Sequence, residues 1–198
     1  GPMRFRLTGV VVPEAAEGLP LLPFFRLHDS RYQMYWQLTT REAIASQRER
    51  LAAQERAKQA RDAATLDAVA VGEQQSEVEH DFLGENSDTG LREGRRWRRG
   101  EWFQYTFNTR GEQRVEVSVT YWGEERNKSF VIQAGGVPIG SESLNVPEPG
   151  QYLEKRYPIP TEVLGAATDG RITIKFSAQP GSWVGGVYDI RLMKAEAP

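Results

Sequence analysis

The spacing of apolar and polar residues changes twice along the chain and divides it into three parts. Residues 1–38 hold short apolar runs between proline- and glycine-rich turns, a pattern typical of a few β-strands. Residues 39–66 contain no glycine or proline and are rich in alanine, arginine, glutamine and glutamate, which predicts a long linking helix. From residue 67 to residue 198, short runs of alternating apolar and polar residues predict β-strands to the end of the chain.

The predicted helix opens with the capping box Thr39-x-x-Glu42, in which each side chain bonds the other residue's backbone N–H. Its apolar stripe is thin and consists mainly of Ile44, Leu51, Leu66 and alanines. We therefore expect the helix to lie across a shallow surface rather than in a deep core. Polar residues at the a and d positions argue against a coiled coil.

Alternation is clearest in residues 114–121, where Val115, Val117, Val119 and Tyr121 share one face and polar residues share the other. One buried and one solvated face are typical of a β-sandwich. Eight such runs are predicted as strands: 67–71, 101–107, 114–122, 129–135, 137–144, 152–159, 171–178 and 187–194. The predicted fold is mainly β: a jelly-roll β-sandwich of the galactose-binding-like type, preceded by one long α-helix and a short N-terminal β segment.

Composition excludes several classes of function. The chain has no cysteine, which rules out thiol nucleophiles, thiolate zinc sites and disulfides. Its net charge of -2 gives the whole molecule no long-range attraction for nucleic acid. No run of 18 apolar residues is present, so we expect no membrane partner. Gly1-Pro2 ahead of Met3 is typical of the remnant that a protease leaves when a tag is removed.

Candidates for catalysis are few. Only His28 and His80 offer imidazole, and both stand where structural roles for histidine are common: a turn, and a predicted first sandwich strand. No P-loop, G-x-G-x-x-G or G-x-S-x-G motif is present, and no carboxylate pair has a distinctive spacing. We therefore expect a non-catalytic chain.

The aromatic residues near predicted loops favour sugar binding, because sugars stack on flat rings and bond polar side chains through their hydroxyl groups. Trp97, Trp122 and Trp183 adjoin loops that a jelly roll could gather at one rim. Three neighbours of Trp122 complete the candidate set: Tyr121, Arg126 and Asn127. The alternative is that each tryptophan folds back onto the sandwich, where arginine stems cover it.

The segment REGRRWRRGEW, residues 92–102, holds five arginines and raises the question of nucleic acid. Glu93 and Glu101 flank the arginines, and an acidic segment precedes them, so their field is largely cancelled. We predict a loop that leads into the strand at residue 101 and contributes Trp97 and one or two arginines to the rim or to an interface of a parent enzyme.

The order of motifs resembles the β-jelly-roll carbohydrate-binding modules of families 6 and 35. The matching stretches are Glu77-Val78-Glu79, residues 100–105, residues 119–121, residues 130–140 and Tyr188-Asp189-Ile190-Arg191. A wider resemblance is to the C-terminal accessory region of glycoside hydrolase family 127, the β-L-arabinofuranosidase type. It is carried by residues 23–38, the helix, and residues 69–90, 130–140 and 180–193.

This second resemblance implies that residues 1–38 are the tail of a preceding β-sandwich and that the catalytic barrel lies elsewhere in the parent protein. The family's catalytic residues are cysteines and glutamate around zinc, which a chain without cysteine cannot contain. The resemblance to the binding modules implies a structural calcium ion shared by Glu79, or Glu77, and Asp189. Seven acids in residues 73–93 suit a hard cation, although they could instead pair with nearby arginines and stay solvated.

The sequence therefore predicts a non-catalytic carbohydrate-binding accessory module of a glycoside hydrolase that acts on plant cell-wall polysaccharide. Its expected partners are a polysaccharide or oligosaccharide and the catalytic domain of the parent enzyme, and its expected location is secreted or periplasmic. The alternative is an architectural domain that docks the sandwich onto the parent enzyme and binds no glycan.

Overall fold

A computed structural model describes residues 5–6, 20–21, 40–167 and 169–195. The chain divides into two compact units, residues 1–57 and residues 58–198. In the first unit, β1 (Phe5–Arg6) pairs antiparallel with β2 (Pro20–Leu21). Most of the predicted N-terminal β segment, with His28, lies outside the described residues. No helix in the described part of the chain is long and apolar enough to cross a membrane.

Helix α1 (Arg41–Ala64) begins after Thr40, whose side-chain oxygen accepts the Ala43 N–H at 3.1 Å. Thr40 is thus a capping residue; the predicted cap, Thr39, lies outside the described residues. No residue of α1 is buried, and Ile44 and Leu51 stay 38% and 54% exposed. Within the described part of the chain, no surface covers this thin apolar stripe, so the expected packing of the helix is not found there.

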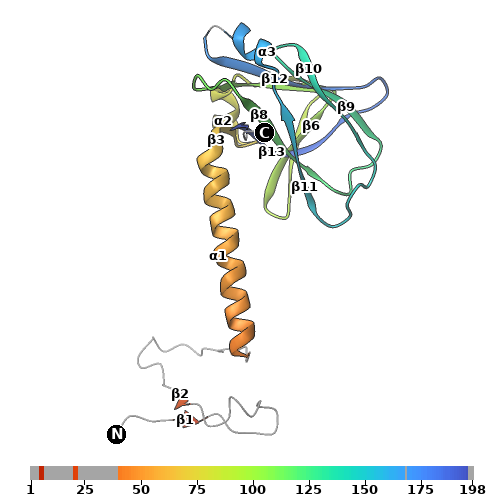
Figure 1. Cartoon of the computed structure of the whole chain (residues 1–198). Coiled ribbons are helices and arrows are strands. Elements are labelled where there is room, and N and C mark those ends of the chain that lie inside the picture. The colour runs from red at the N-terminus through yellow and green to blue at the C-terminus, as the bar shows by residue number, and fades with distance from the viewer. Residues whose placement is uncertain (1–4, 7–19, 22–39, 168, 196–198) are drawn as a thin grey trace. The chain divides into compact units, whose positions relative to one another are not determined.

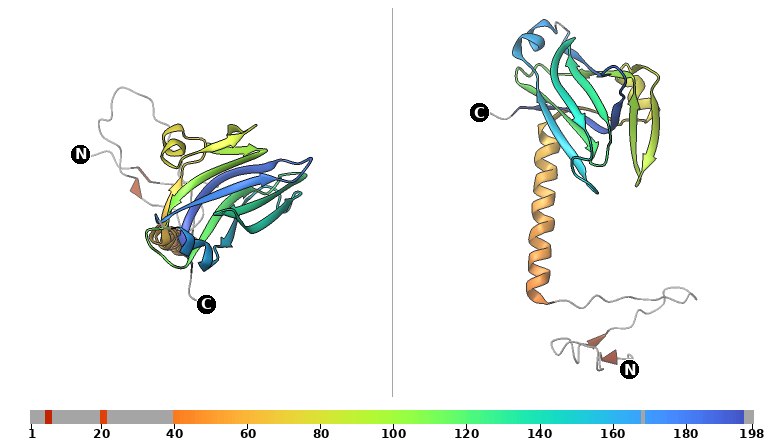
Figure 2. Two further views of the ribbon diagram at one scale, coloured as in Figure 1. Left: turned by 90° about the horizontal axis from the view of Figure 1, so that it is seen from above. Right: turned by 90° about the vertical axis from the view of Figure 1, so that its right-hand side faces the viewer.

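The second unit is a sandwich of two antiparallel sheets that lie face to face (Figures 1 and 2). The five-stranded sheet has the order β10 (Val137–Leu144), β9 (Lys128–Ala134), β12 (Arg171–Ala178), β7 (Trp102–Asn108) and β4 (Leu83–Glu85). The six-stranded sheet has the order β11 (Tyr152–Pro158), β8 (Val115–Trp122), β13 (Val184–Lys194), β6 (Arg95–Gly100) and β5 (Asp88–Arg92), and β3 (Thr65–Val69) also pairs with β13. Sequence neighbours are repeatedly separated in space, which confirms the predicted jelly roll.

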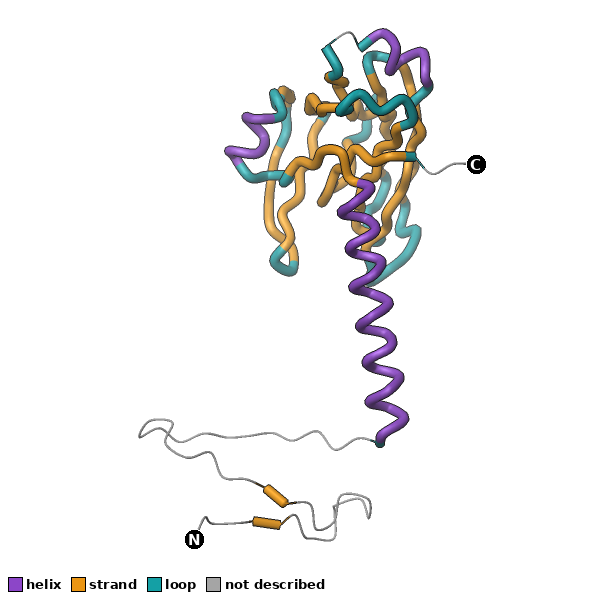
Figure 3. Tube along the Cα trace, turned by 60° about the vertical axis from the view of Figure 1, so that its left-hand side comes forward, coloured by secondary structure: helices purple, strands orange, loops and turns teal. Residues whose placement is uncertain are grey.

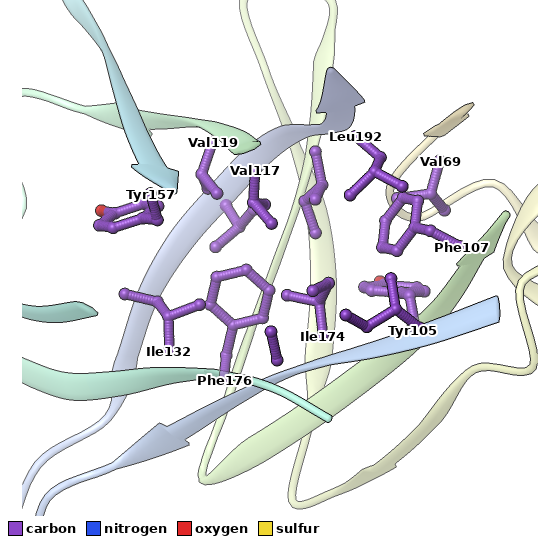
Figure 4. Packing of buried hydrophobic residues seen from close by; sticks show 14 of the residues in the cluster. Val69, Tyr105, Phe107, Val117, Val119, Ile132, Tyr157, Ile174, Phe176 and Leu192 are labelled. Atoms are coloured by element: carbon purple, nitrogen blue, oxygen red, sulfur yellow. The ribbon is translucent and has the colours of Figure 1, made fainter. Parts of the chain in front are cut away.

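The alternation of apolar residues builds the core between the sheets. Val117 and Val119 of β8 are fully buried and point toward Ile132, Ile174 and Phe176 of the facing sheet (Figure 4). Phe103 and Phe176 stack with ring centroids 5.1 Å apart. Full burial of each large apolar side chain contributes about 1.5–3 kcal/mol, so this pattern dominates the stability of the fold.

Two short helices replace expected irregular or extended structure: α2 (Gln74–Glu79) and α3 (Thr161–Ala166), drawn in purple at separate edges of the sandwich in Figure 3. The prediction that His80, directly after the Glu77-Val78-Glu79 stretch, lies on the first sandwich strand is therefore wrong. The Glu73 carboxylate accepts the Ser76 N–H at 2.8 Å and caps α2, which starts a helical turn where alternation suggested a strand. His80 ends α2 and bonds Ser76 and Asp67, a structural role.

The arginine-rich segment is a strand rather than the predicted loop. β6 pairs antiparallel with β5, with Arg92 opposite Arg95. Glu93 and Gly94 between them both have positive φ, 49° and 78°, as a two-residue type I′ turn requires. The tight turn lets the arginines alternate between the two faces of the sheet.

Candidate functional site

Three aromatic rings gather on the face of the six-stranded sheet that points away from the core. Trp122, Tyr152 and Tyr188 come from β8, β11 and β13 and meet edge to face, with centroids 4.9 Å apart in both contacts. The pairing of β13 with β8 shifts register between Val187 and Asp189, so a bulge lies at Tyr188. This bulge turns Tyr188 outward while Val187 stays in the core.

Arginines of the β5–β6 hairpin cover this aromatic cluster. The guanidinium of Arg92 lies 4.1 Å from the Trp122 ring centroid, and that of Arg95 lies 4.2 Å from the Tyr152 centroid. Such cation–π contacts contribute about 0.5–1 kcal/mol each at exposed sites. Burial, together with Tyr152 and the Glu125 carboxylate, raises the pKa of Tyr188 to about 12, so its hydroxyl stays protonated at neutral pH.

A groove of about 300 Å³ opens beside the cluster. We call it the Trp97 groove; its lining residues are Leu91, Arg92, Trp97, Arg99, Trp122, Glu125, Gly186 and Tyr188. Trp97 is half-buried and lies over Gly90, its partner across the β5–β6 pair. A Cβ atom on Gly90 would come within 2.4 Å of the indole, so only glycine lets the ring lie flat at this place.

Charged side chains surround the indole. The Arg99 guanidinium lies 5.0 Å from the Trp97 ring centroid and pairs with Asp88 at 3.2 Å. Glu125 is held by the Gly186 N–H, which donates to its Oε1 at 3.0 Å. The groove thus combines a flat apolar ring with the N–H donors of its arginines and the carboxylate acceptor of Glu125. Glu125 is the one carboxylate in the lining of this groove.

The predicted sugar-binding residues do not form one site in the structure. Trp97 and Trp122 line the Trp97 groove, although Trp122 is only 6% exposed because Arg92 and Tyr152 cover it. Trp183 does not line this groove, so the three tryptophans are not gathered as predicted. Arg126 and Asn127 are exposed on the loop after Glu125 and also lie outside the lining, and their role stays a prediction.

The prediction for Tyr121 is wrong, because its side chain is fully buried in the core. The Tyr157 hydroxyl donates to Glu142 at 2.7 Å, so the Tyr121 hydroxyl, 3.1 Å away, donates to Tyr157. Burial raises the pKa of Tyr121 well above its usual value. Strand alternation explains the outcome: Tyr121 shares the face of Val119, and Trp122 takes the opposite face.

The predicted calcium ligands have other partners. Glu77 is buried and accepts hydrogen bonds from Arg98 Nη2 at 2.6 Å, Arg98 Nε at 2.8 Å and the Tyr105 hydroxyl at 2.8 Å. Glu79 is exposed beside Gln75, and Asp189 accepts from Arg61 at 2.8 Å and Arg191 at 3.0 Å. Among the residues that the structure describes, no three His, Cys, Asp or Glu side chains group as metal ligands do. Calcium binding therefore stays a prediction.

Sequence reasoning missed Tyr152, Tyr188 and Glu125, and it did not single out Arg99 among the arginines of residues 92–102. Alternation could have placed Arg99 beside Trp97, two residues away on one strand face, had residues 95–100 been recognised as a strand. The outward direction of Tyr188 depends on a bulge that the local sequence pattern does not predict. Glu125 sits in the loop after β8 and becomes part of the groove through its contact with Gly186.

Residues 60–193 match the model of DUF6805, described as a family of unknown function, and residues 1–38 match DUF4986, described as a domain of unknown function. Among curated proteins, none matches the sequence.

Solved structures give distant likenesses. A family 35 carbohydrate-binding module from Clostridium thermocellum is 13% identical, with a TM-score of 0.45 over 58% of this chain and 93% of that one. CBM27-1 from Caldicellulosiruptor saccharolyticus, solved with mannohexaose, is 15% identical, with a TM-score of 0.34 over 59% and 91%. An exo-β-1,3-galactanase from Phanerochaete chrysosporium is 11% identical, with a TM-score of 0.41 over 55% of this chain and 26% of that one.

Proposed function

The chain belongs to DUF6805, a family of unknown function, and we propose that it is a non-catalytic module whose Trp97 groove binds carbohydrate. The observation that carries the proposal is the partly exposed indole of Trp97 among Arg99, Arg92 and Glu125. Sugar rings have apolar C–H faces and a rim of hydroxyl groups, so they need a flat ring beneath and charged or polar groups around it.

The packing of the groove supports a binding role because the groove is formed before any ligand arrives. Trp97 is fixed over Gly90, Arg92 over Trp122, and Glu125 on the Gly186 N–H. Side chains that are already held lose little conformational freedom on binding, which favours affinity.

The finer parts of the proposal rest on sequence resemblance. The motifs shared with the C-terminal region of glycoside hydrolase family 127 support an accessory module of an arabinofuranosidase-like enzyme that acts on plant cell-wall polysaccharide outside the cytoplasm. A structural calcium ion held through Glu79 and Asp189 is a separate part of the proposal. Its test is the thermal midpoint with and without a chelator, with a lower midpoint expected in the chelator.

Calorimetric titration with arabinan, xylan and homogalacturonan tests the function. Replacing Trp97 by alanine removes one stacking contact of about 0.5–1.5 kcal/mol and should weaken binding roughly two- to tenfold. Arg99→Ala should also weaken binding. Arg156→Ala is its matched control, because Arg156 has a similarly exposed, ion-paired side chain, 43% against 47%, and lies outside the groove. Binding that is unchanged in both groove variants contradicts the proposal.

An architectural role is the second candidate, and the exposed apolar residues of α1 favour it. Ile44 and Leu51 meet solvent in this chain, while the last turn of α1 is fixed by ion pairs from Arg61 to Asp189 and from Asp62 to Arg191. A helix attached in this way suits docking to the catalytic domain of a parent enzyme. No response to any glycan, together with loss of that docking in Leu51→Asp, would support architecture instead.

A further inference from the structure

A second groove, of about 500 Å³, shares no lining residue with the Trp97 groove. We call it the Trp183 groove. Trp102 and Lys175 in its lining alternate with the core residues Phe103 and Phe176, so they lie on the outer face of the five-stranded sheet. The Trp97 groove lies on the outer face of the six-stranded sheet. The two grooves therefore open on opposite sides of the sandwich.

The loop that carries Trp183 is tied firmly to its neighbours. The Gln179 N–H donates to the Ser129 carbonyl at 2.8 Å, and the Ser129 N–H donates to Ser182 Oγ at 2.7 Å. The Ser182 N–H closes the turn onto the Gln179 carbonyl at 2.9 Å. Despite these ties, the Trp183 side chain stays 40% exposed. A large apolar ring held in solvent by a fixed loop is prepared to stack on a ligand.

The groups around Trp183 resemble those of the first groove in their chemistry. The Lys175 ammonium lies 4.3 Å from the Trp102 ring centroid, and the Trp102 N–H donates to Glu85 at 3.1 Å. These two contacts hold the Trp102 ring in one orientation in the lining of the groove. Within the part of the chain that the structure describes, neither Lys175 nor Glu101 forms an ion pair. Both charges thus remain available to bond the hydroxyl groups of a sugar stacked on Trp183.

We propose that the Trp183 groove is a second sugar-binding site, so that one module holds two glycan chains at once. This inference rests on the proposed function. Face-to-face sheets are about 10 Å apart, and the side chains of both outer faces add to that distance. A trisaccharide cannot reach both grooves, so short ligands should bind two to one, and long polysaccharides should be cross-linked.

Calorimetric titration with arabinotriose, xylotriose and trigalacturonate counts the sites. We expect two molecules of a binding trisaccharide per wild-type protein. Trp97→Ala and Trp183→Ala should each leave one site at wild-type affinity and weaken the other roughly two- to tenfold, and the double variant should weaken both sites. Leu83→Ala is the control, because Leu83 is also exposed, at 57%, and lines neither groove. Thermal midpoints close to the wild-type value establish that each variant is folded.

Three results would overturn the inference, and they separate it from the proposed function. Binding of one molecule that Trp97→Ala weakens and Trp183→Ala leaves unchanged refutes the second site and keeps the first. Loss of all binding in folded Trp183→Ala refutes two independent sites. No heat from any of the three probes with wild-type protein refutes both proposals. With arabinan, turbidity that appears for wild type and disappears in each single variant supports cross-linking.

Discussion

The buried ion pair between Glu77 and Arg98 gives the most direct test of how the sandwich is held together. Both side chains are only 8% exposed, and the carboxylate also accepts the Tyr105 hydroxyl and the Gly72 N–H, each at 2.8 Å. In Glu77→Gln, the amide cannot neutralise Arg98, and its NH₂ group faces donors rather than acceptors. Removing one partner of such a pair costs about 3–5 kcal/mol, because a charge stays buried without compensation.

Urea unfolding measures this cost as a lower midpoint at an unchanged slope. Glu116→Gln, which removes one of the two carboxylate partners of the more exposed Arg156 and leaves Glu154, should cost at most about 1 kcal/mol and serves as the comparison. A double-mutant cycle with Arg98→Met should show strong coupling, because the two side chains act as one unit. A loss below about 1 kcal/mol for Glu77→Gln would refute the reasoning.

The same carboxyl predicts a pH dependence. Burial by itself raises the pKa of Glu77, but the hydrogen bonds from Arg98, Gly72 and Tyr105 outweigh burial and hold the pKa below 4.5. A lowered folded-state pKa means that its stabilisation is fully present above about pH 4.5 and is lost as the pH falls through the folded-state pKa. The difference in unfolding free energy between wild type and Glu77→Gln should therefore shrink below pH 4.5. A difference that stays constant down to pH 3 would contradict this.

Three further substitutions test other parts of the structure. Thr40→Ala removes the N-cap of α1 and should lower helix stability by about 1 kcal/mol, seen as weaker helical circular dichroism; an unchanged spectrum would contradict the cap. Tyr121→Phe removes a buried hydrogen bond and should lower the unfolding free energy by about 1 kcal/mol without changing glycan affinity; a loss of affinity would place Tyr121 at the ligand after all. Gly90→Val displaces Trp97 and should weaken glycan binding about as much as Trp97→Ala, and unchanged affinity would show that the indole's position does not matter.

Local patterns predicted the sandwich well where one residue in two is apolar. β8 and β12 occupy nearly the residues expected of them, and their apolar faces form the core. The pattern failed where a side chain outweighed it. The Glu73 side chain caps residues 74–79, which therefore form a helix. The two-residue turn at Glu93 and Gly94 pairs the arginine-rich segment with β5, so that segment forms a strand.

The candidate site was predicted only in part, because its residues meet through strand order. Arg92 reaches Trp122 thirty residues away only because β5 and β8 belong to the same sheet. Likewise, Trp97 and Trp183 are both near turns in the sequence, yet they line grooves on different sides of the sandwich. The spacing of residues along the chain does not predict on which side of the sandwich each tryptophan lies.

By itself, the sequence determined which residues prefer the interior, since a period of two commits every second side chain of a strand to one face. It also determined the long helix and excluded any chemistry that needs a thiol. The tertiary structure alone decided which charges neutralise one another, as when Glu77 meets Arg98 and Asp189 meets Arg61 across 128 residues. The order of the strands and the positions of the helix ends bring these partners together. The energy of an ion pair depends on the distance between the two charges in space and not on their separation along the chain.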